Sequence, residues 1–281
     1  MSQQGSRGRD GTRRTRLPRV RVIALVVASF AAGAAVTTAI AGNKGGSSKA
    51  PIVSLRPTGV GLPEIGATEN FGVPRLAEMI RAYHDSGRFA ADLNQIAGRA
   101  QRDLRTQLKR LKYNRTKGAY KKCKHKRGKR RCKRVNPALV LDIDDTALSR
   151  YAHLDAVDFD YSGVVLGVVE ADSPPIQPTL DLYRFAIKRD VNVFFITGIP
   201  PELRAGTEKN LQDAGYSQWN DVSMKPTGVP VVEFKSGERK RIQDQGFRIL
   251  VNLGDQESDL DGGHAKKAFK VPNPMYFIPA D

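Results

Sequence analysis

The chain has 281 residues, of which 40% are hydrophobic, and its formal net charge is +17. This length and apolar content allow one sizeable core or two modest ones, and the Gly, Pro and aromatic contents exclude a fibrous protein and wholesale disorder. The charge is uneven: residues 1–42 carry seven Arg and one Asp, residues 109–134 carry fifteen Lys or Arg and no acid, and the remainder is slightly acidic. The high net charge therefore belongs to two segments and does not by itself indicate a nucleic-acid-binding protein.

The N-terminus is typical of an export segment. Seven Arg lie within residues 7–21, and residues 22–42 carry no charge and contain the small-x-small pattern Ala39-Ile40-Ala41 near their end. Residues 1–42 are therefore predicted to be a cleaved signal peptide, with an uncleaved membrane anchor as the alternative, because the apolar run is long enough to span a bilayer. Either interpretation places the body outside the cytoplasm, secreted or anchored to the cell membrane. Residues 43–70, rich in Gly, Pro and Ser, are predicted to be a flexible linker.

Residues 71–281 are predicted to form one α/β domain. Helical apolar spacing from Pro74 to Leu111 breaks at Ser86-Gly87, which predicts two helices ahead of the sheet. Short, unalternating apolar strands separated by helices then indicate a Rossmann-like parallel sheet with helices on both faces. The predicted strands are Ala138–Ile143, Val191–Thr197, Val229–Phe234 and Phe247–Leu253, and the predicted helices are Pro178–Lys188, Pro201–Ala214 and Ser236–Gln245.

Polar residues follow each predicted strand. In parallel α/β folds ligands bind beyond the carboxyl ends of the strands, so these residues are candidates for one site. Several carboxylates crowded together repel one another unless a cation lies between them, and Mg²⁺ prefers oxygen ligands. The residues are Asp142, Asp144 and Thr146 after the first strand, Thr197 and Gly198 after the second, Lys235 after the third, and Asp255 and Asp259 after the fourth.

These residue types fit a phosphate-transfer site. An Asp carboxylate such as Asp142 can attack phosphorus to give an aspartyl-phosphate. A second Asp two residues on, Asp144, can protonate the leaving oxygen and then deprotonate the hydrolytic water. A metal ion, Lys235 and the Thr197 hydroxyl can neutralise and hydrogen-bond the phosphate oxygens.

The four motifs resemble those of the haloacid dehalogenase superfamily. They are "DIDDT", "FFITG", Lys235 in "FKSGERK", and "GDQESD". Longer stretches, such as "NPALVLDIDDTALSRY" and "FKVPNPMYFIP", are similar to the plant-type and bacterial acid phosphatases of that superfamily (class B-like, subfamily IIIB), a group that includes vegetative storage proteins. The resemblance covers about residues 65–281, apart from the basic segment. It implies the haloacid dehalogenase fold, here with an N-terminal helical extension and a small cap formed by residues 149–177.

The resemblance also implies a role for each residue. Asp142 would be the nucleophile and a Mg²⁺ ligand, and Asp144 would be the general acid/base and would bind the metal through its backbone carbonyl. Thr197, Gly198 and Lys235 would hold the phosphoryl group. Asp255 would complete the protein ligands, with Asp259 in or next to the metal's coordination shell.

One agreement with the family and one departure from it bear on activity. Some storage proteins of the group lack the nucleophile, but this chain keeps Asp142. The similar enzymes usually have Arg after Thr-Gly, where this chain has Ile199. The cap is expected to line a substrate pocket, and the alternative is that its side chains simply pack against the protein. The candidate lining residues are polar or aromatic: Tyr151, His153, Asp155, Asp158, Phe159, Asp160 and Tyr161.

The basic segment, residues 109–134, allows several interpretations. Cys123 and Cys132, the two cysteines of the chain, predict a disulfide-closed hairpin outside the cytoplasm, whereas zinc would lack ligands with only His125 nearby. The segment could be a solvated insertion, steer phosphorylated substrates, or dock on an anionic cell-wall polymer or a membrane surface. Nucleic acid is a less favoured partner because aromatic residues for base stacking are few.

The sequence therefore predicts an exported, Mg²⁺-dependent acid phosphatase acting on a small phosphomonoester through an aspartyl-phosphate on Asp142. One alternative is a cell-envelope polyanion-binding protein with a vestigial phosphatase site. The other is a phosphotransferase that uses the same site and passes the phosphoryl group to an alcohol. The sequence makes no prediction of substrate identity or oligomeric state.

Overall fold

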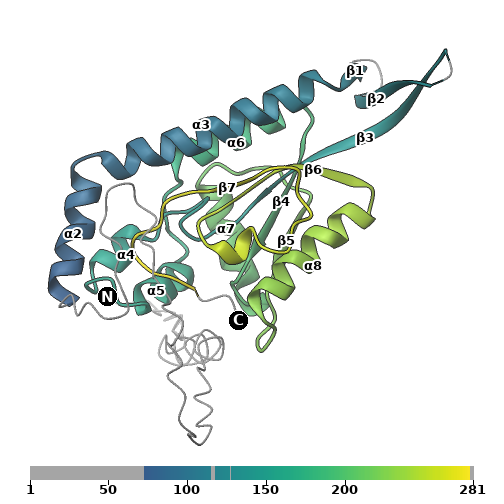
Figure 1. The fold of residues 1–281 in the computed structure, drawn as a ribbon. Helices are drawn as coiled ribbons and strands as arrows, with labels where there is room; N and C mark the ends of the chain where they lie inside the picture. Colours follow the sequence, from purple (N-terminus) through teal and green to yellow (C-terminus); the bar gives the residue numbers. More distant parts are fainter. Residues whose placement is uncertain (1–72, 115–117, 127, 279–281) are drawn as a thin grey trace, which may run out of the picture.

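The structure is a computed structural model that describes residues 73–114, 118–126 and 128–278 (Figure 1). The predicted signal peptide or anchor at residues 1–42 and the predicted linker at residues 43–70 lie outside the described residues. Within the described residues, no helix combines the length and the apolar character needed to cross a membrane.

Two helices precede the sheet, as the sequence predicts: α2, Val73–Asp85, and α3, Arg88–Lys109. Gly87 separates them with a left-handed backbone (φ 76°), a conformation that glycine adopts without steric cost. The long helix α3 lies along one side of the sheet in Figure 1. Its buried apolar side chains recur at steps of three or four, so one face of the helix enters the core. They are Phe89, Leu93, Ala97, Ala100, Leu104 and Leu108.

Five parallel strands form the centre of the molecule, in the order β7–β6–β3–β4–β5. The sheet is covered on both faces, which explains why its strands are apolar without alternation. On β4, for example, Val193 and Phe195 belong to the core shared with α3, while Phe194 and Ile196 belong to the core under α8. The strands are β3, Lys129–Leu141; β4, Asn192–Thr197; β5, Asp221–Met224; β6, Phe247–Gly254; and β7, Ala268–Lys270.

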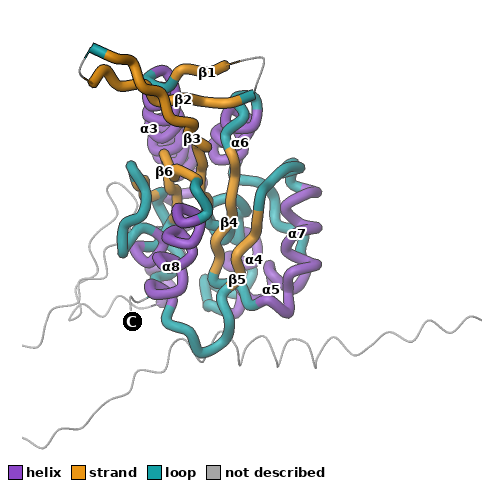
Figure 2. Tube along the Cα trace, turned by 90° about the vertical axis from the view of Figure 1, so that its right-hand side faces the viewer, coloured by secondary structure: helices purple, strands orange, loops and turns teal. Residues whose placement is uncertain are grey.

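Helices α3, α6 (Gln177–Ile187) and α7 (Arg204–Asp213) contribute side chains to one core, and α8 (Val231–Asp244) covers the opposite face of the sheet (Figure 2). A 3₁₀ turn, Pro201–Leu203, leads into α7. The predicted fold class, a parallel α/β sheet with helices on both faces, is confirmed.

One predicted strand is wrong. Val229–Phe234 does not form a strand: α8 begins at Val231, and the third strand of the sheet is β5, which the sequence analysis missed. The buried residues of α8 are Val231, Lys235, Arg239 and Ile242, a helical spacing in which two positions are charged. A helix is recognised from the spacing of its apolar residues, and the charged buried positions of α8 interrupt that spacing. What remains is the short apolar run at the start of the helix, which resembles a strand. Lys235 therefore lies on a helix and not after a strand.

The basic segment forms a hairpin that continues into the sheet. Strand β1, Lys112–Asn114, pairs with β2, Ala119–Lys126, which pairs antiparallel with the first half of β3. Cys123 lies directly opposite Cys132, and a disulfide joins them, in agreement with the predicted hairpin. Strand β3 then enters the sheet between β4 and β6, so one strand serves both the hairpin and the core.

The predicted cap, residues 149–177, contains two short helices, α4 (Tyr151–Asp155) and α5 (Ser162–Glu170). They lie between the end of β3 and the start of α6 in the chain. Leu154 of α4 and Val164 of α5 share a small apolar cluster with Ile80 of α2. The N-terminal extension therefore packs against this segment.

Candidate active site

The polar residues that follow the strands meet at the carboxyl edge of the sheet. Strand β3 ends at Leu141 and β6 ends at Gly254, and because the two are parallel neighbours, Asp142 and Asp255 emerge side by side. The Asp142 amide donates to the Leu253 carbonyl at 3.0 Å, which extends the ladder by one residue. The nucleophile candidate thus continues the hydrogen bonding between β3 and β6.

A buried cluster of three carboxylates lies at this edge. Oxygens of Asp142, Asp255 and Asp259 are all within 4.8 Å of one another. Asp259 belongs to a 3₁₀ turn, Glu257–Asp259, directly after β6. Lys235 reaches the cluster from α8: its Nζ donates to Asp142 Oδ1 at 2.8 Å and also to Asp259 Oδ1. Lys235 is 5% exposed, so this ammonium is one of the cluster's partners and not a surface group.

The electrostatics of the cluster favour an additional cation. Burial and then the charge of Asp259 raise the pKa of Asp142 well above its usual range, although Lys235 opposes the rise. Burial alone would lower the pKa of Lys235, but the carboxylates of Asp142 and Asp259 outweigh it and raise that pKa. Lys235 bonds to two of the three carboxylates, and Lys270 Nζ donates to the Asp255 backbone carbonyl, so ionisation of all three carboxylates leaves at least one negative charge uncompensated. This all-oxygen donor set fits a hard divalent cation such as Mg²⁺.

Neutral donors fix the orientation of Asp255. Its Oδ1 accepts from Thr146 Oγ1 at 3.1 Å, and its Oδ2 accepts from Gln256 Nε2 at 2.6 Å and Asn273 Nδ2 at 2.7 Å. Burial, and then the charge of Asp259, raise the pKa of Asp255 to about 6 despite these bonds. Asn273 lies in the stretch "FKVPNPMYFIP", which carries the family resemblance, but its sequence alone gave no reason to assign it to Asp255.

A buried arginine holds Asp144 apart from the three-carboxylate cluster. Arg150 Nε donates to Asp144 Oδ1 at 2.8 Å, and Arg150 is 1% exposed. Its Nη1 donates to the Gly167 carbonyl at 2.7 Å and to Ser173 Oγ at 2.5 Å. Gly167 leaves room for this side chain, because a Cβ there would lie 2.9 Å from Arg150 Cδ. The role of Arg150 was not predicted from the sequence, because a single Arg does not indicate which groups accept its hydrogen bonds.

The residues after β4 line the same edge. Thr197 Oγ1 accepts from the Ile199 amide at 3.1 Å and lies 3.5 Å from Asp144 Oδ2, to which it can donate. A Cβ on Gly198 would meet nothing within 4 Å, so open space adjoins its backbone. Ile199 is fully buried in the main core. The apolar residue at this position therefore packs against the interior.

The cap residues differ in what they contact. Tyr161 lies near the acids: burial and then the charges of Asp144 and Asp255 raise its pKa. Other members of the predicted pocket lining have structural partners. Asp155 and Asp158 pair with Arg81 of α2, Tyr151 stacks on His84, Phe159 packs in the cap cluster, and His153 contacts Glu170 and Asp172.

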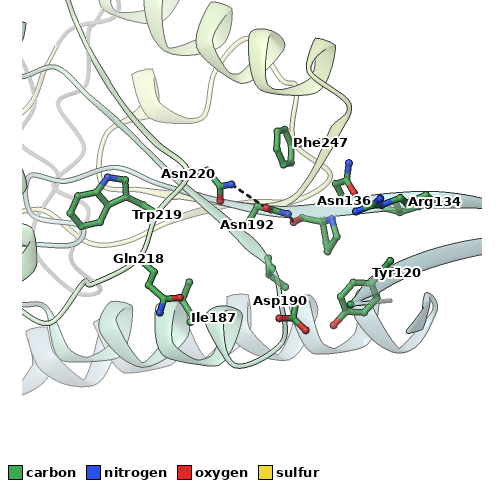
Figure 3. A pocket seen from close by; sticks show the side chains of 15 residues that line it. Tyr120, Arg134, Asn136, Ile187, Asp190, Asn192, Gln218, Trp219, Asn220 and Phe247 are labelled. Carbon is green, nitrogen blue, oxygen red and sulfur yellow. Dashed lines mark hydrogen bonds between the residues drawn. The ribbon is translucent and has the colours of Figure 1, made fainter. Parts of the chain in front are cut away.

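A cavity of about 560 Å³ lies at the opposite edge of the sheet (Figure 3). Its lining includes the starts of the strands, with Asn192, Asn220 and Phe247, and the edge of the core at Trp219. The amides brace the strand starts: Asn220 Nδ2 donates to Asn192 Oδ1 at 3.1 Å, and Asn192 Nδ2 donates to the Pro137 carbonyl at 3.0 Å. This cavity contains none of the predicted catalytic residues.

The structure thus brings together Asp142, Lys235, Asp255 and Asp259, and it places Asp144 and Thr197 beside each other at the same edge. The Asp144 side chain is not part of the three-carboxylate cluster, which leaves its backbone carbonyl as the atom for the predicted metal contact. The catalytic, metal-binding and phosphate-binding roles of these residues stay predictions.

Comparisons with known proteins agree with the predicted family. The profile of the HAD superfamily, subfamily IIIB (acid phosphatase), matches residues 75–279. Acid phosphatase 1 of Solanum lycopersicum is 34% identical over 150 residues, which cover 50% of this chain and 58% of that protein. Vegetative storage protein 1 of Arabidopsis thaliana is 27% identical over 149 residues, covering 50% of this chain and 55% of that protein. The chain thus spans less than two thirds of the length of these relatives.

Among solved structures, the class C acid phosphatase from Bacillus anthracis shares the fold, with a TM-score of 0.55 and 18% identity. The match covers 73% of this chain and 86% of that one. The family profile covers well over half of the chain, including all four motifs at the carboxyl edge of the sheet. The chain belongs to subfamily IIIB of the HAD superfamily, the acid phosphatase subfamily.

Proposed function

We propose that this protein is a metal-dependent phosphomonoesterase that acts through an aspartyl-phosphate on Asp142. One observation carries the proposal. The Lys235 ammonium bonds to Asp142 after β3 and to Asp259 after β6, in a buried cluster that also holds Asp255. Charged groups are costly to bury, and with all three carboxylates ionised this set balances only when a cation joins it. Membership of an acid phosphatase subfamily supports the same chemistry.

In the first step the Asp142 carboxylate attacks the phosphorus of a phosphomonoester. A bond forms between Asp142 oxygen and phosphorus, and the bond between phosphorus and the leaving oxygen breaks. Asp144, as a carboxylic acid, gives its proton to that oxygen and releases the alcohol. Lys235 and the Thr197 hydroxyl hold the phosphoryl oxygens, and the backbone at Gly198 borders the space that these oxygens would occupy.

In the second step water hydrolyses the aspartyl-phosphate. Asp144, now a carboxylate, accepts a proton from the water as its oxygen bonds to phosphorus, and Asp142 leaves as a carboxylate with inorganic phosphate released. Arg150 keeps the Asp144 carboxylate in one orientation through both steps, since its guanidinium has buried acceptors in Gly167 and Ser173. Asp144 thereby returns to its starting protonation state.

The carboxylates of Asp142, Asp255 and Asp259, with the Asp144 carbonyl, would hold Mg²⁺, which would neutralise charge on the cluster and on the phosphate. Export is part of the proposal: a disulfide such as Cys123–Cys132 persists in oxidising compartments. N-terminal sequencing of protein recovered from cells and medium tests it. A chain that begins near residue 42 supports cleavage, and an intact N-terminus in the membrane fraction supports the anchor.

The activity is tested by p-nitrophenyl phosphate turnover by the full chain, with EDTA and after Mg²⁺ is restored. Asp142→Asn is expected to abolish release of p-nitrophenol, whereas Asp244→Asn, at an exposed ion pair on α8, is expected to leave it unchanged. Comparison of free phosphate with phosphorylated glycerol in the products separates hydrolysis from phosphotransfer. A wild-type protein that releases no p-nitrophenol with any divalent cation would refute the proposal and favour the polyanion-binding alternative.

A further inference from the structure

The hairpin of β2 and β3 is a strongly cationic arm, called here the basic ribbon (residues 121–126 and 129–134). It projects from the sheet beyond the end of α3 in both views (Figures 1 and 2). Residues 109–134 contain no Asp or Glu. Among the ribbon cations whose side chains the structure describes, none forms an ion pair with a carboxylate. Its charge is therefore not balanced by the described part of the protein.

Like charges face each other across the basic ribbon. Lys122 pairs with Lys133, and Lys124 pairs with Arg131, on either side of the disulfide-bonded pair. Like charges at directly opposite positions destabilise a two-stranded sheet, and an isolated hairpin is marginal in water. The disulfide therefore keeps together a surface that repels itself, and a bound polyanion would relieve the repulsion. The arrangement is suited to binding anions more than to supporting the fold.

Both faces of the basic ribbon carry cations. Because successive side chains of a strand point to opposite faces, Lys122, Lys124 and their partners occupy one face, while Lys121 and its partner Arg134 occupy the other. A flat bilayer or a rigid duplex can contact one face at a time, whereas a flexible chain can contact both.

Cations of the protein body extend one face. Arg248, at the start of β6, pairs with Pro137 of β3, and the Lys266 amide donates to the Ile249 carbonyl at 3.0 Å, so both residues lie near the base of the ribbon. The charge of Arg248, then desolvation and the charges of Lys124 and Lys266, lower the pKa of Lys122. Arg248 and Lys266 therefore lie close enough to Lys122 to add to the same positive surface. The ribbon and the adjoining sheet edge thus form one cationic surface.

A cavity of about 480 Å³ is lined by Lys267, the residue that follows Lys266 in the chain. Lys267 lines it together with Arg99 and Arg102 of α3, and Asp103 is the one acid among its described lining residues. Cationic side chains thus follow one another from the basic ribbon to the groove between α3 and β7. A linear anion has more contact length here than the ribbon alone provides.

The side chains of the basic ribbon also narrow the type of partner. The described ribbon positions carry no Phe, Tyr or Trp on which a base could stack; the imidazole of His125 is the one aromatic ring among them, and Tyr120, at the base of the ribbon, is buried. They carry no large apolar side chain that could insert into a bilayer. Arginine adds forked donors that match the paired oxygens of a phosphate diester. A flexible, base-free phosphodiester polymer fits these features.

We infer that the basic ribbon and the adjoining cations form a docking surface for a linear polyol-phosphate polymer, bound through its backbone charge. The basic ribbon lies beyond the amino-terminal side of the sheet, and the carboxylate cluster lies at the carboxyl edge, at the other end of β3. The groove lined by Lys267 lies nearer the carboxyl edge, because Ala268 pairs with Asn252 close to the end of β6. None of the cations named for docking is a predicted catalytic residue, so docking and catalysis use different side chains. The docking surface stands whether or not the proposed hydrolysis does.

The test measures binding of the full chain to purified poly(glycerol phosphate) as a function of salt concentration. Five ribbon cations are replaced together by Gln, and a control replaces five exposed cations of α6, α7, α8 and their ends. The ribbon variant carries Lys122→Gln, Lys124→Gln, Lys129→Gln, Arg131→Gln and Lys133→Gln; the control carries Arg184→Gln, Lys188→Gln, Arg204→Gln, Lys209→Gln and Lys240→Gln. Both variants keep every predicted catalytic residue, and the two lose the same number of positive charges.

The ribbon variant is expected to bind about 100-fold more weakly than the wild type at low salt. Its plot of log affinity against log salt concentration should be less steep by about 3.5, which is about 0.7 for each of the five lost phosphate contacts. The control is expected to bind within about threefold of the wild type. Turnover of p-nitrophenyl phosphate is expected to be the same in both, which shows that the ribbon variant is folded. Asp142→Asn is expected to bind like the wild type.

Three results would overturn the inference. The first is equal loss of binding in the two five-residue variants, which would indicate a response to net charge alone. The second is tighter binding to anionic phospholipid vesicles or to duplex DNA than to poly(glycerol phosphate) at the same salt. The third is equal binding to poly(glutamate), which would show that the phosphate diester is not recognised.

Discussion

Replacement of Arg150 by Met tests whether this buried guanidinium holds Asp144 in place. Met keeps most of the apolar stem and removes the Nε bond to Asp144 and the Nη1 bonds to Gly167 and Ser173. The Arg150 side chain is 1% exposed and the Asp144 side chain 15% exposed, so the carboxylate gains little water in exchange. Removal of one partner from a buried ion pair costs about 3–5 kcal/mol, and we expect about 3 kcal/mol because Asp144 reaches some solvent.

The assay is urea denaturation followed by fluorescence of Trp219, the single Trp of the chain, which packs at the edge of the core. The control is Lys209→Met, which breaks an ion pair whose side chains are 70% and 58% exposed and should cost about 0.3–0.5 kcal/mol. A loss of folding free energy below about 1 kcal/mol for Arg150→Met, or one equal to the control, would refute the reasoning.

Arg150→Met should also lower turnover of p-nitrophenyl phosphate by about 100-fold, because a displaced acid/base group no longer meets the leaving oxygen. The loss should appear mainly in kcat, since the phosphate contacts of Lys235 and Thr197 are untouched. Arg150→Lys keeps the charge but cannot reach all three acceptors, and an intermediate kcat is expected. A rise in KM with unchanged kcat would mean that Arg150 affects substrate binding and does not orient Asp144.

Three further predictions concern other parts of the site and the hairpin. Burial raises the pKa of Asp145 to about 8, so the folded protein favours the neutral acid, and its folding free energy in EDTA should decrease as pH rises from about 4 to 8. Asn tolerates the left-handed backbone at this position (φ 49°), and Asp145→Asn should remove up to roughly 4 kcal/mol of that decrease in urea titrations. Parallel pH profiles of the variant and the wild type would contradict this prediction. Gly254→Ala would bring a Cβ within 2.3 Å of Asp259 Cβ and displace that carboxylate. We expect a loss of kcat of at least about tenfold with an unchanged circular dichroism spectrum, whereas a wild-type kcat would show that the turn adapts. Replacement of both Cys123 and Cys132 by Ser should increase protease cleavage within residues 121–134 without changing turnover, and an unchanged cleavage pattern would show that strand pairing alone holds the hairpin.

Much of the site could be predicted because parallel strands deliver their next residues to one edge. Asp142 and Asp255 follow apolar strands that are easily recognised, and their convergence depends only on the sheet being parallel. The element that carries Lys235 was predicted incorrectly, since two of the four buried positions of α8, Lys235 and Arg239, are charged. When a helix buries charged residues on its inner face, its apolar residues do not recur at helical spacing, and the sequence pattern does not indicate a helix.

Other features required the three-dimensional structure. Strand β5, Asp221–Met224, is a short edge strand with two polar residues, which gives too weak a pattern to identify. Arg150 bonds to Gly167, 17 residues away, as well as to Asp144, and Asn273 bonds to Asp255, 18 residues away; a single Arg or Asn in a sequence does not indicate its acceptor. Tertiary hydrogen bonds of this kind leave no local periodicity.

Strand β3 runs for 13 residues from the hairpin tip to the residue before Asp142. At about 3.3 Å per residue, this rigid strand separates the two ends of the molecule by about 40 Å, several times the distance over which salt screens charge, about 8 Å. A protein tethered to a charged matrix by its hairpin would point its reaction centre away from that matrix, toward the surrounding fluid. Diffusing phosphate esters would then reach the centre without competing with the charges of the support.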